Sequence, residues 1–316
     1  MKRLDRILAV LDPTADSQPG LEKAAQLAQK FGARVELFVC DFDPALTGRP
    51  FFDTDGLRRL RDDFISERTQ WMEQKARQIG DRGIATETHI HWDNPLYRGI
   101  VRRVEESSPD LVVKDTHYHS AIRRTLLSNT DWNLIRTCPA PLLLAKAEPW
   151  SEPPRLLAAL DPGHAGDTPA SLDHQILDYG EMLAKRLGGE LHAVHAFFPA
   201  ALLAAVTGMA GIPSVAGVSS AEIIDGERKR IARELDEILD AHELSGDRMH
   251  LLQGAAVQVL PRLASDMAVD ILVMGGISRS RLKELFIGST AEHIIDRIAC
   301  DVLVVKTDDF AEKLSD

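Results

Sequence analysis

The chain contains two copies of one sequence unit, and this repeat restricts the folds that it can adopt. Residues 6–13 read RILAVLDP, and residues 155–162 restate them as RLLAALDP. Three further pairs occur in the same order: AQKFG at 28–32 with AKRLG at 184–188, SPDLVVK at 108–114 with AVDILVM at 268–274, and CPAPLLLAK at 138–146 with IACDVLVVK at 298–306. The repeat predicts two similar domains, and 316 residues are enough for both.

Each unit alternates short apolar runs with amphipathic segments. In the first unit, the runs at 6–11, 35–40 and 141–145 are typical of buried strands, and the periodicity of 21–31 and 57–79 is typical of helices. This alternation predicts an α/β fold of two tandem, doubly wound, five-stranded parallel sheets, with ligands at the carboxyl ends of the strands. The expected boundaries are a first domain at 1–147, a linker at 148–154, a second domain at 155–307 and a tail at 308–316.

The composition favours a folded cytoplasmic protein. No apolar run approaches the ~18 residues of a membrane helix, and the first residues, MKRLDRILAVLDP, lack the pattern of a signal peptide. A net charge of −11 would repel a phosphate backbone, so we expect neither nucleic acid nor a membrane as partner. The three cysteines are scattered without C-x-x-C spacing, which indicates neither disulfides nor a thiolate metal site.

One stretch of the second unit, residues 273–296, combines a strand end, a glycine turn and a helix start. Ile271 to Met274 reads as a buried strand, Gly275-Gly276 as its exit turn, and Ser289-Thr-Ala-Glu292 as a capping box. The free N–H groups and partial positive charge of such a helix start suit a phosphate. The alternative is a turn and a cap without a ligand.

The internal repeat and this stretch together make the chain resemble the universal stress protein family in its tandem two-domain form. The resemblance extends over nearly the whole chain. The family pattern is G-x2-G-x9-G-[ST] after the fourth strand, and Gly275, Ser278, Gly288 and Ser289 fall on its four named positions. Ser278 departs from the second glycine, and a serine there would strain the turn and crowd a phosphate. In the first unit the same positions carry no glycine: they are Asp115, Tyr118, Ser128 and Asn129.

The resemblance implies a Rossmann-like sheet order of 3-2-1-4-5 and an adenine nucleotide such as ATP, with or without Mg²⁺, in the second domain. The implied binding residues are Asp161 and Ala196 at the base, Met274 and Gly275 at the ribose and phosphates, and Ser278, Gly288, Ser289 and Thr290 at the phosphates. For Asp161 the alternative is a simple Asp-Pro turn, since Asp12-Pro13 recurs in the other unit. In the first unit, Asp115 would repel phosphate, so that domain is expected to be a structural partner.

The family also implies that the fifth strands, 141–145 and 302–306, adjoin edge to edge as a pseudo-dimer, with a further homodimer left open. Such pairing would cover two exposed sheet edges.

Basic residues alternate through the loop of the second unit. Arg279, Arg281 and Lys283 are candidate phosphate contacts, with a solvated basic face as the alternative.

Residues 197–217 form a nearly apolar linker, which could be a lid, a dimer contact or a segment packed on its own domain.

The histidine pairs His89/His91, His117/His119 and His192/His195 suggest solvated strand ends more than a metal site, so no metal is expected.

No catalytic motif occurs in the sequence, and no catalytic residue can be named. The main hypothesis is therefore a stress-response protein that binds an adenine nucleotide, or a related phosphate-containing ligand, in its second domain. Slow ATP hydrolysis is compatible with the family but does not follow from any residue. The alternative is a nucleotide-independent scaffold, or a carrier of an apolar or acyl-bearing ligand.

Overall fold

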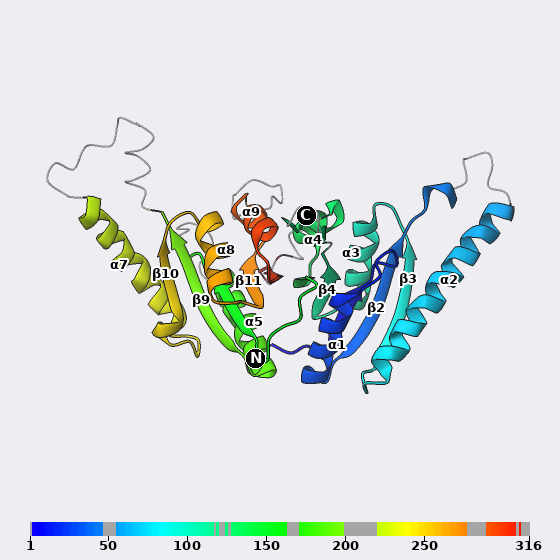
Figure 1. Ribbon diagram of the computed structural model, residues 1–316, viewed down its shortest axis with the longest axis horizontal. Helices are drawn as coiled ribbons and strands as arrows, with labels where there is room; N and C mark the ends of the chain where they lie inside the picture. Colours follow the sequence, from blue (N-terminus) through cyan, green and yellow to red (C-terminus); the bar gives the residue numbers. More distant parts are fainter. Residues whose placement is uncertain are drawn as a thin grey trace, which may run out of the picture. The chain divides into compact units, whose positions relative to one another are not determined.

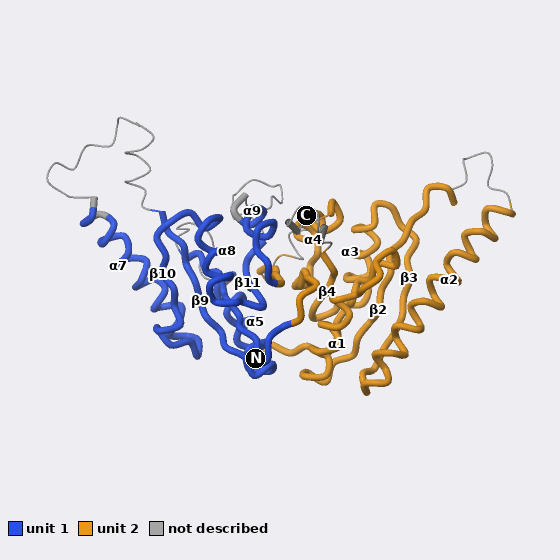
Figure 2. The backbone as a smooth tube through the Cα atoms, in the orientation of Figure 1, with its two compact units in different colours: residues 1, 150–300 blue, residues 2–149, 301–316 orange. Residues whose placement is uncertain are grey.

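The computed structural model describes residues 2–46, 55–116, 118–119, 124–125, 128–162, 171–198, 220–276, 289–307 and 310. The chain forms two compact units, shown in different colours in Figure 2. We call residues 2–149 together with 301–316 the N-terminal unit, and residues 150–300 the C-terminal unit. Strands and helices alternate along the chain in each unit (Figure 1).

The N-terminal unit contains a predominantly parallel sheet in the order β12-β7-β4-β1-β2-β3. Its strands are β1 (Arg6–Val10), β2 (Arg34–Asp41), β3 (Thr86–Trp92), β4 (Leu111–Asp115), β7 (Leu142–Ala145) and β12 (Asp301–Val305), with a separate short pair of β5 (Tyr118–His119) and β6 (Arg124–Thr125). Its helices are α1 (Pro19–Phe31), α2 (Asp55–Gly80), α3 (Leu96–Ser107), α4 (Asn129–Thr137) and the short η1 (Pro44–Leu46). The first repeat therefore has the expected strand order 3-2-1-4-5.

The C-terminal unit repeats this plan with the parallel order β10-β9-β8-β11. Its strands are β8 (Arg155–Ala159), β9 (Glu190–Phe197), β10 (Met249–Gln253) and β11 (Ile271–Gly275). Its helices are α5 (Ser171–Leu187), α7 (Ser220–Leu239), α8 (Ala256–Asp266), α9 (Ser289–Arg297) and the short η2 (Gly246–Arg248). The strand order confirms the predicted doubly wound α/β class.

The last strand of the second repeat, β12, belongs to the N-terminal unit. It pairs antiparallel with β7, with Val302 opposite Leu144 and Val304 opposite Leu142. All five residues of β12 are buried. The fifth strands of the two repeats thus adjoin as predicted, and the pairing covers the edge of β7 that would otherwise be exposed.

Local sequence signals explain where the helices begin and end. Helix α1 has a proline in its first turn and ends at Gly32, which adopts the left-handed conformation with φ 72°. Its small and apolar face, which includes Ala24 and Leu27, is fully buried. Helix α1 packs on β1 and β4, and α5 packs in the same way on β8 and β11. The two helices therefore occupy equivalent places in the repeats. Across the described ranges, no helix has the length and apolar character needed to cross a membrane.

Candidate functional site

The sheet order reverses around β8, because β9 lies on one side of this strand and β11 on the other. In open α/β sheets, such a reversal places a ligand crevice at the carboxyl ends of the strands. Asp161 follows β8, whereas Met274 and Gly275 end β11, and these two strands are parallel neighbours. Ala196 lies near the end of β9, opposite Leu252 of β10. The fold therefore brings four of the residues predicted from the sequence to one edge of the sheet.

Gly275 lies at a close approach between β11 and α5. A Cβ atom on Gly275 would lie 2.7 Å from Cδ2 of Leu172, which is inside van der Waals contact. Met274 beside it is buried, with 5% of its surface exposed. A side chain at position 275 would therefore displace Leu172 or enter the space at the strand ends.

Buried polar groups hold the turn after β8. The backbone N–H of Asp161 donates to Oδ1 of Asp173 at 3.0 Å, and Asp173 is only 1% exposed. On the other side, Nδ1 of the buried His195 lies 2.9 Å from the carbonyl oxygen of Leu160. The residue Asp161 itself is exposed. Its backbone is thus fixed by hydrogen bonds while its side chain is accessible at the sheet edge.

The equivalent position of the first repeat carries a carboxylate that is used internally. Asp115 ends β4 and is 5% exposed, and its Oδ1 accepts a hydrogen bond from the backbone N–H of Gly20 in the first turn of α1. A Cβ atom on Gly20 would lie 2.6 Å from this oxygen. A carboxylate of the protein therefore occupies the helix N-terminus, where an anion would bind.

The other motif positions of the first repeat also have structural partners. Ser128 caps α4: its side chain accepts from the backbone N–H of Asp131 at 3.2 Å, and Oδ2 of Asp131 accepts from the backbone N–H of Ser128 at 2.7 Å. Asn129 begins the helix, and Tyr118 lies in β5. A reciprocal cap of this kind satisfies two N–H groups at the helix start without a ligand.

Part of the predicted phosphate loop lies outside the described residues: Ser278, Arg279, Arg281, Lys283 and Gly288. Ser289 and Thr290 are the first two residues of α9, so the predicted helix is present and starts at Ser289 itself. Residues 199–217 of the apolar linker also lie outside the described ranges, whereas Phe197 is buried and Phe198 is 45% exposed. His117 is likewise outside them.

The expectation of solvated histidines at strand ends is wrong for His195, which is buried with 7% of its surface exposed. His195 contacts the main chain of Leu160, whereas Nδ1 of His192 lies 3.2 Å from Nε2 of His250 on the neighbouring strand. His91 packs edge-on against Phe38, with ring centroids 5.0 Å apart. The cross-strand pairing of His192 with His250 was not anticipated.

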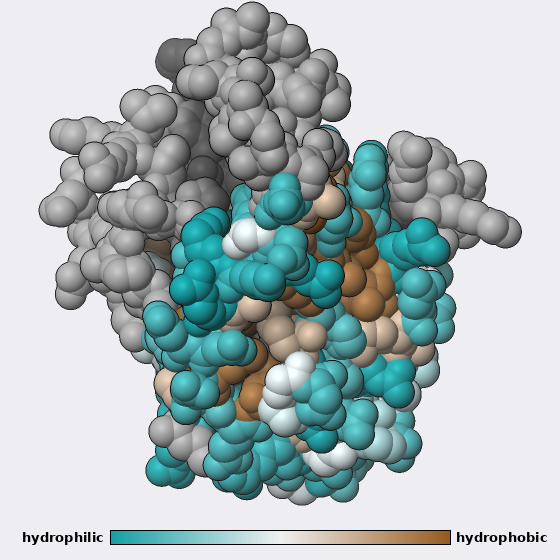
Figure 3. All heavy atoms as spheres, turned by 90° about the vertical axis from the view of Figure 1, so that its left-hand side faces the viewer, coloured by the Kyte–Doolittle hydropathy of each residue, from teal (hydrophilic) through white to brown (hydrophobic). Residues whose placement is uncertain are grey.

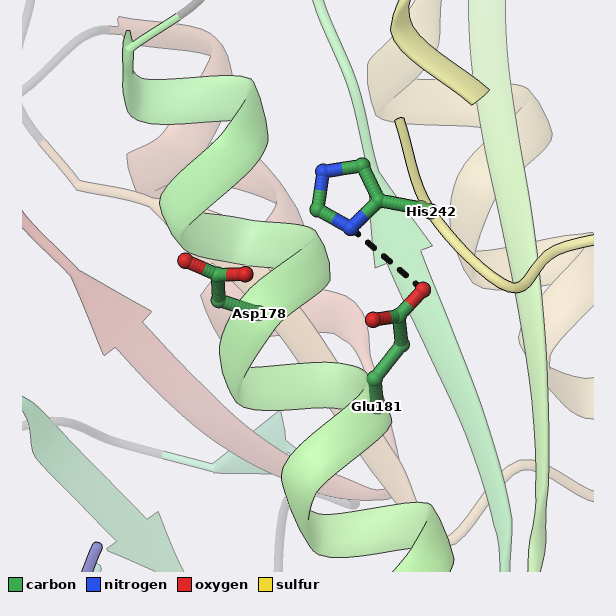
Figure 4. A group of neighbouring side chains, drawn as sticks. All are labelled: Asp178, Glu181 and His242. Carbon is green, nitrogen blue, oxygen red and sulfur yellow. Dashed lines mark ion pairs between the residues drawn. The ribbon is translucent and has the colours of Figure 1, made fainter. Parts of the chain in front are cut away.

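A second group of side chains was missed at the sequence level. It lies in the C-terminal unit and contains His174, Asp178, Glu181 and His242 (Figure 4, which labels the last three). The spacing of the first three, at i, i+4 and i+7, is a helical-face signal that the sequence does contain. Nothing in the sequence connects them to His242, which follows α7.

Two tandem doubly wound sheets, each with its order reversed beside its first strand, define a tandem Rossmann-like α/β protein. The sequence pattern of the universal stress protein family matches residues 3–146 and 156–306, so the chain belongs to this family.

The chain is similar to relatives of the tandem type over nearly its whole length. Universal stress protein E of Salmonella typhi is 29% identical over 311 residues, which are 98% of this chain and 96% of the relative. The Universal stress protein E homolog of Haemophilus influenzae is 24% identical and covers 96% of this chain and 98% of its own. Two solved structures share the fold. A putative universal stress protein of Pseudomonas aeruginosa has a TM-score of 0.73 at 23% sequence identity, and the match covers 98% of this chain and 96% of that protein. A universal stress protein of Archaeoglobus fulgidus has a TM-score of 0.69 at 18% sequence identity, and the match covers 95% of this chain and 98% of that protein.

Proposed function

We propose that the C-terminal unit binds an adenine nucleotide, such as ATP with or without Mg²⁺, and that the N-terminal unit is its structural partner in a stress-response protein. The observation that carries this proposal is the contrast between Gly275 and Asp115. The two residues end equivalent strands, and each faces the first turn of the equivalent helix. In the first repeat a carboxylate of β4 faces a glycine of α1, whereas in the second a glycine of β11 faces Leu172 of α5, so no acidic side chain of β11 lies at the helix start.

The nucleotide would lie across the carboxyl ends of β8 and β11. The exposed Asp161 carboxylate would accept a hydrogen bond from the adenine amino group, with Ala196 beside the base. Met274 and Gly275 would border the ribose and phosphates, and the amides at the start of α9, with Ser289 and Thr290, would bind phosphate. Gly288 would let the loop approach the phosphates, Ser278 would lie beside them in a more crowded turn, and Arg279, Arg281 or Lys283 would add charge.

The ligand chemistry agrees with the charge of the chain. A net charge of −11 repels the phosphate backbone of a polynucleotide over most of the surface. A mononucleotide contacts only a small local site, where helix amides and basic side chains would bind its phosphates. No catalytic role is assigned to any residue. Binding, rather than turnover, is the proposed activity.

Calorimetry of the full chain with ATP and Mg²⁺ tests the proposal. We expect saturable binding of one equivalent, abolished by the double change Gly288→Val, Ser289→Ala. The matched control is Asn129→Ala, which alters the corresponding helix start of the first repeat and should leave the affinity unchanged. If ATP does not bind saturably up to millimolar concentrations, the proposal is wrong. If the double variant binds ATP with unchanged affinity, Gly288 and Ser289 do not belong to the site.

A second candidate function is an apolar-ligand carrier on the same fold. Phe198 is 45% exposed at the start of the apolar linker. Figure 3 also shows apolar residues reaching the surface, among polar ones, on the side of the molecule that carries α7 and β10. Thermal shifts with acyl ligands distinguish the two functions, because a carrier responds to these ligands and not to ATP.

A further inference from the structure

Helix α5 presents one imidazole and two carboxylates along a single face. His174, Asp178 and Glu181 are four and three residues apart, which places successive side chains one turn apart on an α-helix. His242, in the turn after α7, reaches the same face (Figure 4). The ligand-bearing atoms of Asp178, Glu181 and His242 all lie within 4.8 Å of one another. Side chains from two separate segments therefore converge on one point.

The two nitrogens of His242 face different partners. Nδ1 lies 3.3 Å from Oε1 of Glu181, and Nε2 lies 2.9 Å from Nδ1 of His174. The two imidazole rings are stacked, with centroids 5.1 Å apart and planes 24° apart. A proton on Nε2 of His242 would be donated to His174, which leaves the lone pair of Nδ1 directed towards the carboxylate. Metal-binding histidines use this arrangement, in which the outer nitrogen is held by a second group.

The charge and burial of the cluster favour a cation. The side chain of His242 is 6% exposed and that of Glu181 is 29% exposed, so the imidazole is buried and the carboxylate is partly shielded from water. Glu181 is also fixed by the backbone N–H of Glu243, which donates to Oε1 at 2.9 Å. Within the residues that the structure describes, Asp178 has no ion-pair partner. With both imidazoles neutral, two carboxylates leave a net charge of −2, which a divalent cation would balance.

We propose that Asp178, Glu181 and His242 bind a divalent transition-metal ion, with His174 as the outer partner of His242. One imidazole nitrogen and carboxylate oxygens form a ligand set that Zn²⁺ accepts, and three protein ligands leave a position for water or another molecule. The ion takes the place between Nδ1 of His242 and the two carboxylates. It ties α5 to the turn that follows α7, and it does not depend on nucleotide binding.

A chain of hydrogen bonds without a metal would use Glu181, His242 and His174 only. Asp178 has no part in such a chain, but it is a ligand in the proposed site. The response of metal binding to Asp178→Asn therefore separates the two arrangements.

The test is calorimetric titration of the chelator-treated full chain with ZnCl₂. We expect one equivalent to bind, with at least tenfold weaker affinity in Asp178→Asn and in His242→Gln, and about 10–100-fold in His174→Gln. The control is His250→Gln, which removes a histidine from the other close imidazole pair of the same unit and should not change the affinity. If His242→Gln does not fold, the variant Asp178→Asn, at a half-buried position of α5, decides between the two arrangements.

A spectroscopic probe checks the ligands directly. Co²⁺ in place of Zn²⁺ should give visible absorption bands of a protein-bound ion in the wild type and in His250→Gln, but not in Asp178→Asn. Zinc should also raise the melting temperature of the wild type more than that of Asp178→Asn. No binding of Zn²⁺ by the wild type, or wild-type affinity in the Asp178→Asn or the His242→Gln variant, would overturn the proposal.

Discussion

Nζ of Lys23 lies 2.6 Å from the carboxylate of Asp301, and the two side chains are 5% and 2% exposed. Lys23 Nζ also donates to the carbonyl oxygen of Lys146 at 2.7 Å, and the backbone N–H of Lys146 donates to Oδ1 of Asp301 at 2.8 Å. Asp301 is the first residue of β12, Lys146 follows β7, and Lys23 lies in α1. The last strand of the second repeat is therefore fastened to the first repeat by a buried ion pair as well as by strand pairing.

Breaking this pair should destabilise the N-terminal unit. Lys23→Met removes the ammonium group that lies against the buried Asp301 carboxylate, and breaking a buried ion pair in this way costs about 3–5 kcal/mol. Urea unfolding of the full chain measures the loss. The control is Arg82→Gln, because the Arg82–Glu22 pair has a similar distance of 2.6 Å but side chains that are 40% and 59% exposed; such exposed pairs contribute about 0–1 kcal/mol.

The double change Lys23→Met, Asp301→Leu sharpens this prediction. Replacing both charges by apolar groups removes the desolvation penalty, so the double variant should be more stable than Lys23→Met alone. If the single variant unfolds at the urea concentration of the wild type, the ion pair does not hold β12.

Gly275→Asp should place at the end of β11 the carboxylate that Asp115 supplies at the end of β4. The new carboxylate would lie at the N-terminus of α5 and repel phosphate, and like charges in contact cost several kcal/mol, so ATP affinity should fall by about 100-fold or more. Gly275→Ala is the matched control, because it introduces the same Cβ beside Leu172 without the charge. If both variants lose the same amount of ATP affinity, steric crowding at position 275, and not the added charge, causes the loss.

The sequence predicts the repeated sheet because strand and helix periodicities are local signals. The strand order came from the resemblance to the family, and this order implied that β8 and β11 are neighbours and that Asp161 and Gly275 lie at one edge of the sheet. Contacts over long sequence separations could not be derived in this way. Asp115 and Gly20 are 95 residues apart, His174 and His242 are 68 apart, and Lys23 and Asp301 are 278 apart. The sequence indicated that Asp115 would exclude phosphate, but not that a helix N–H would bind its carboxylate.

The His192–His250 pair should make stability depend on pH. Burial lowers the pKa of both imidazoles, and the neighbouring charge of His250 lowers the pKa of His192 further. Since the folded state disfavours the protonated forms, their contribution to stability is complete above the unfolded pKa of about 6.5 and is lost as the pH falls below it towards the folded pKa. NMR titration of the imidazole Cε1–H signals measures both values. In His250→Gln, the pKa of His192 should rise, and an unchanged value would contradict the coupling.

Thiol reactivity should distinguish Cys300 from the other two cysteines. Burial, together with the charges of Asp93 and Asp41, raises the pKa of Cys40 to about 12, and burial also raises the pKa of Cys138. Because the thiolate is the reactive form, a pKa of about 12 leaves roughly one Cys40 thiol in ten thousand ionised at pH 8. Cys300 is only partly buried.

Ellman's reagent should therefore titrate one thiol rapidly in the native protein and all three in guanidinium chloride. Cys300→Ser should remove the rapid reaction and leave two thiols that react only on unfolding. Rapid labelling of Cys40 in native Cys300→Ser would mean that β2 and its neighbours open far more often than a buried strand should. Its rate would then measure the opening of the N-terminal unit, because modification of Cys40 requires both solvent access and loss of the buried environment that keeps the thiol protonated.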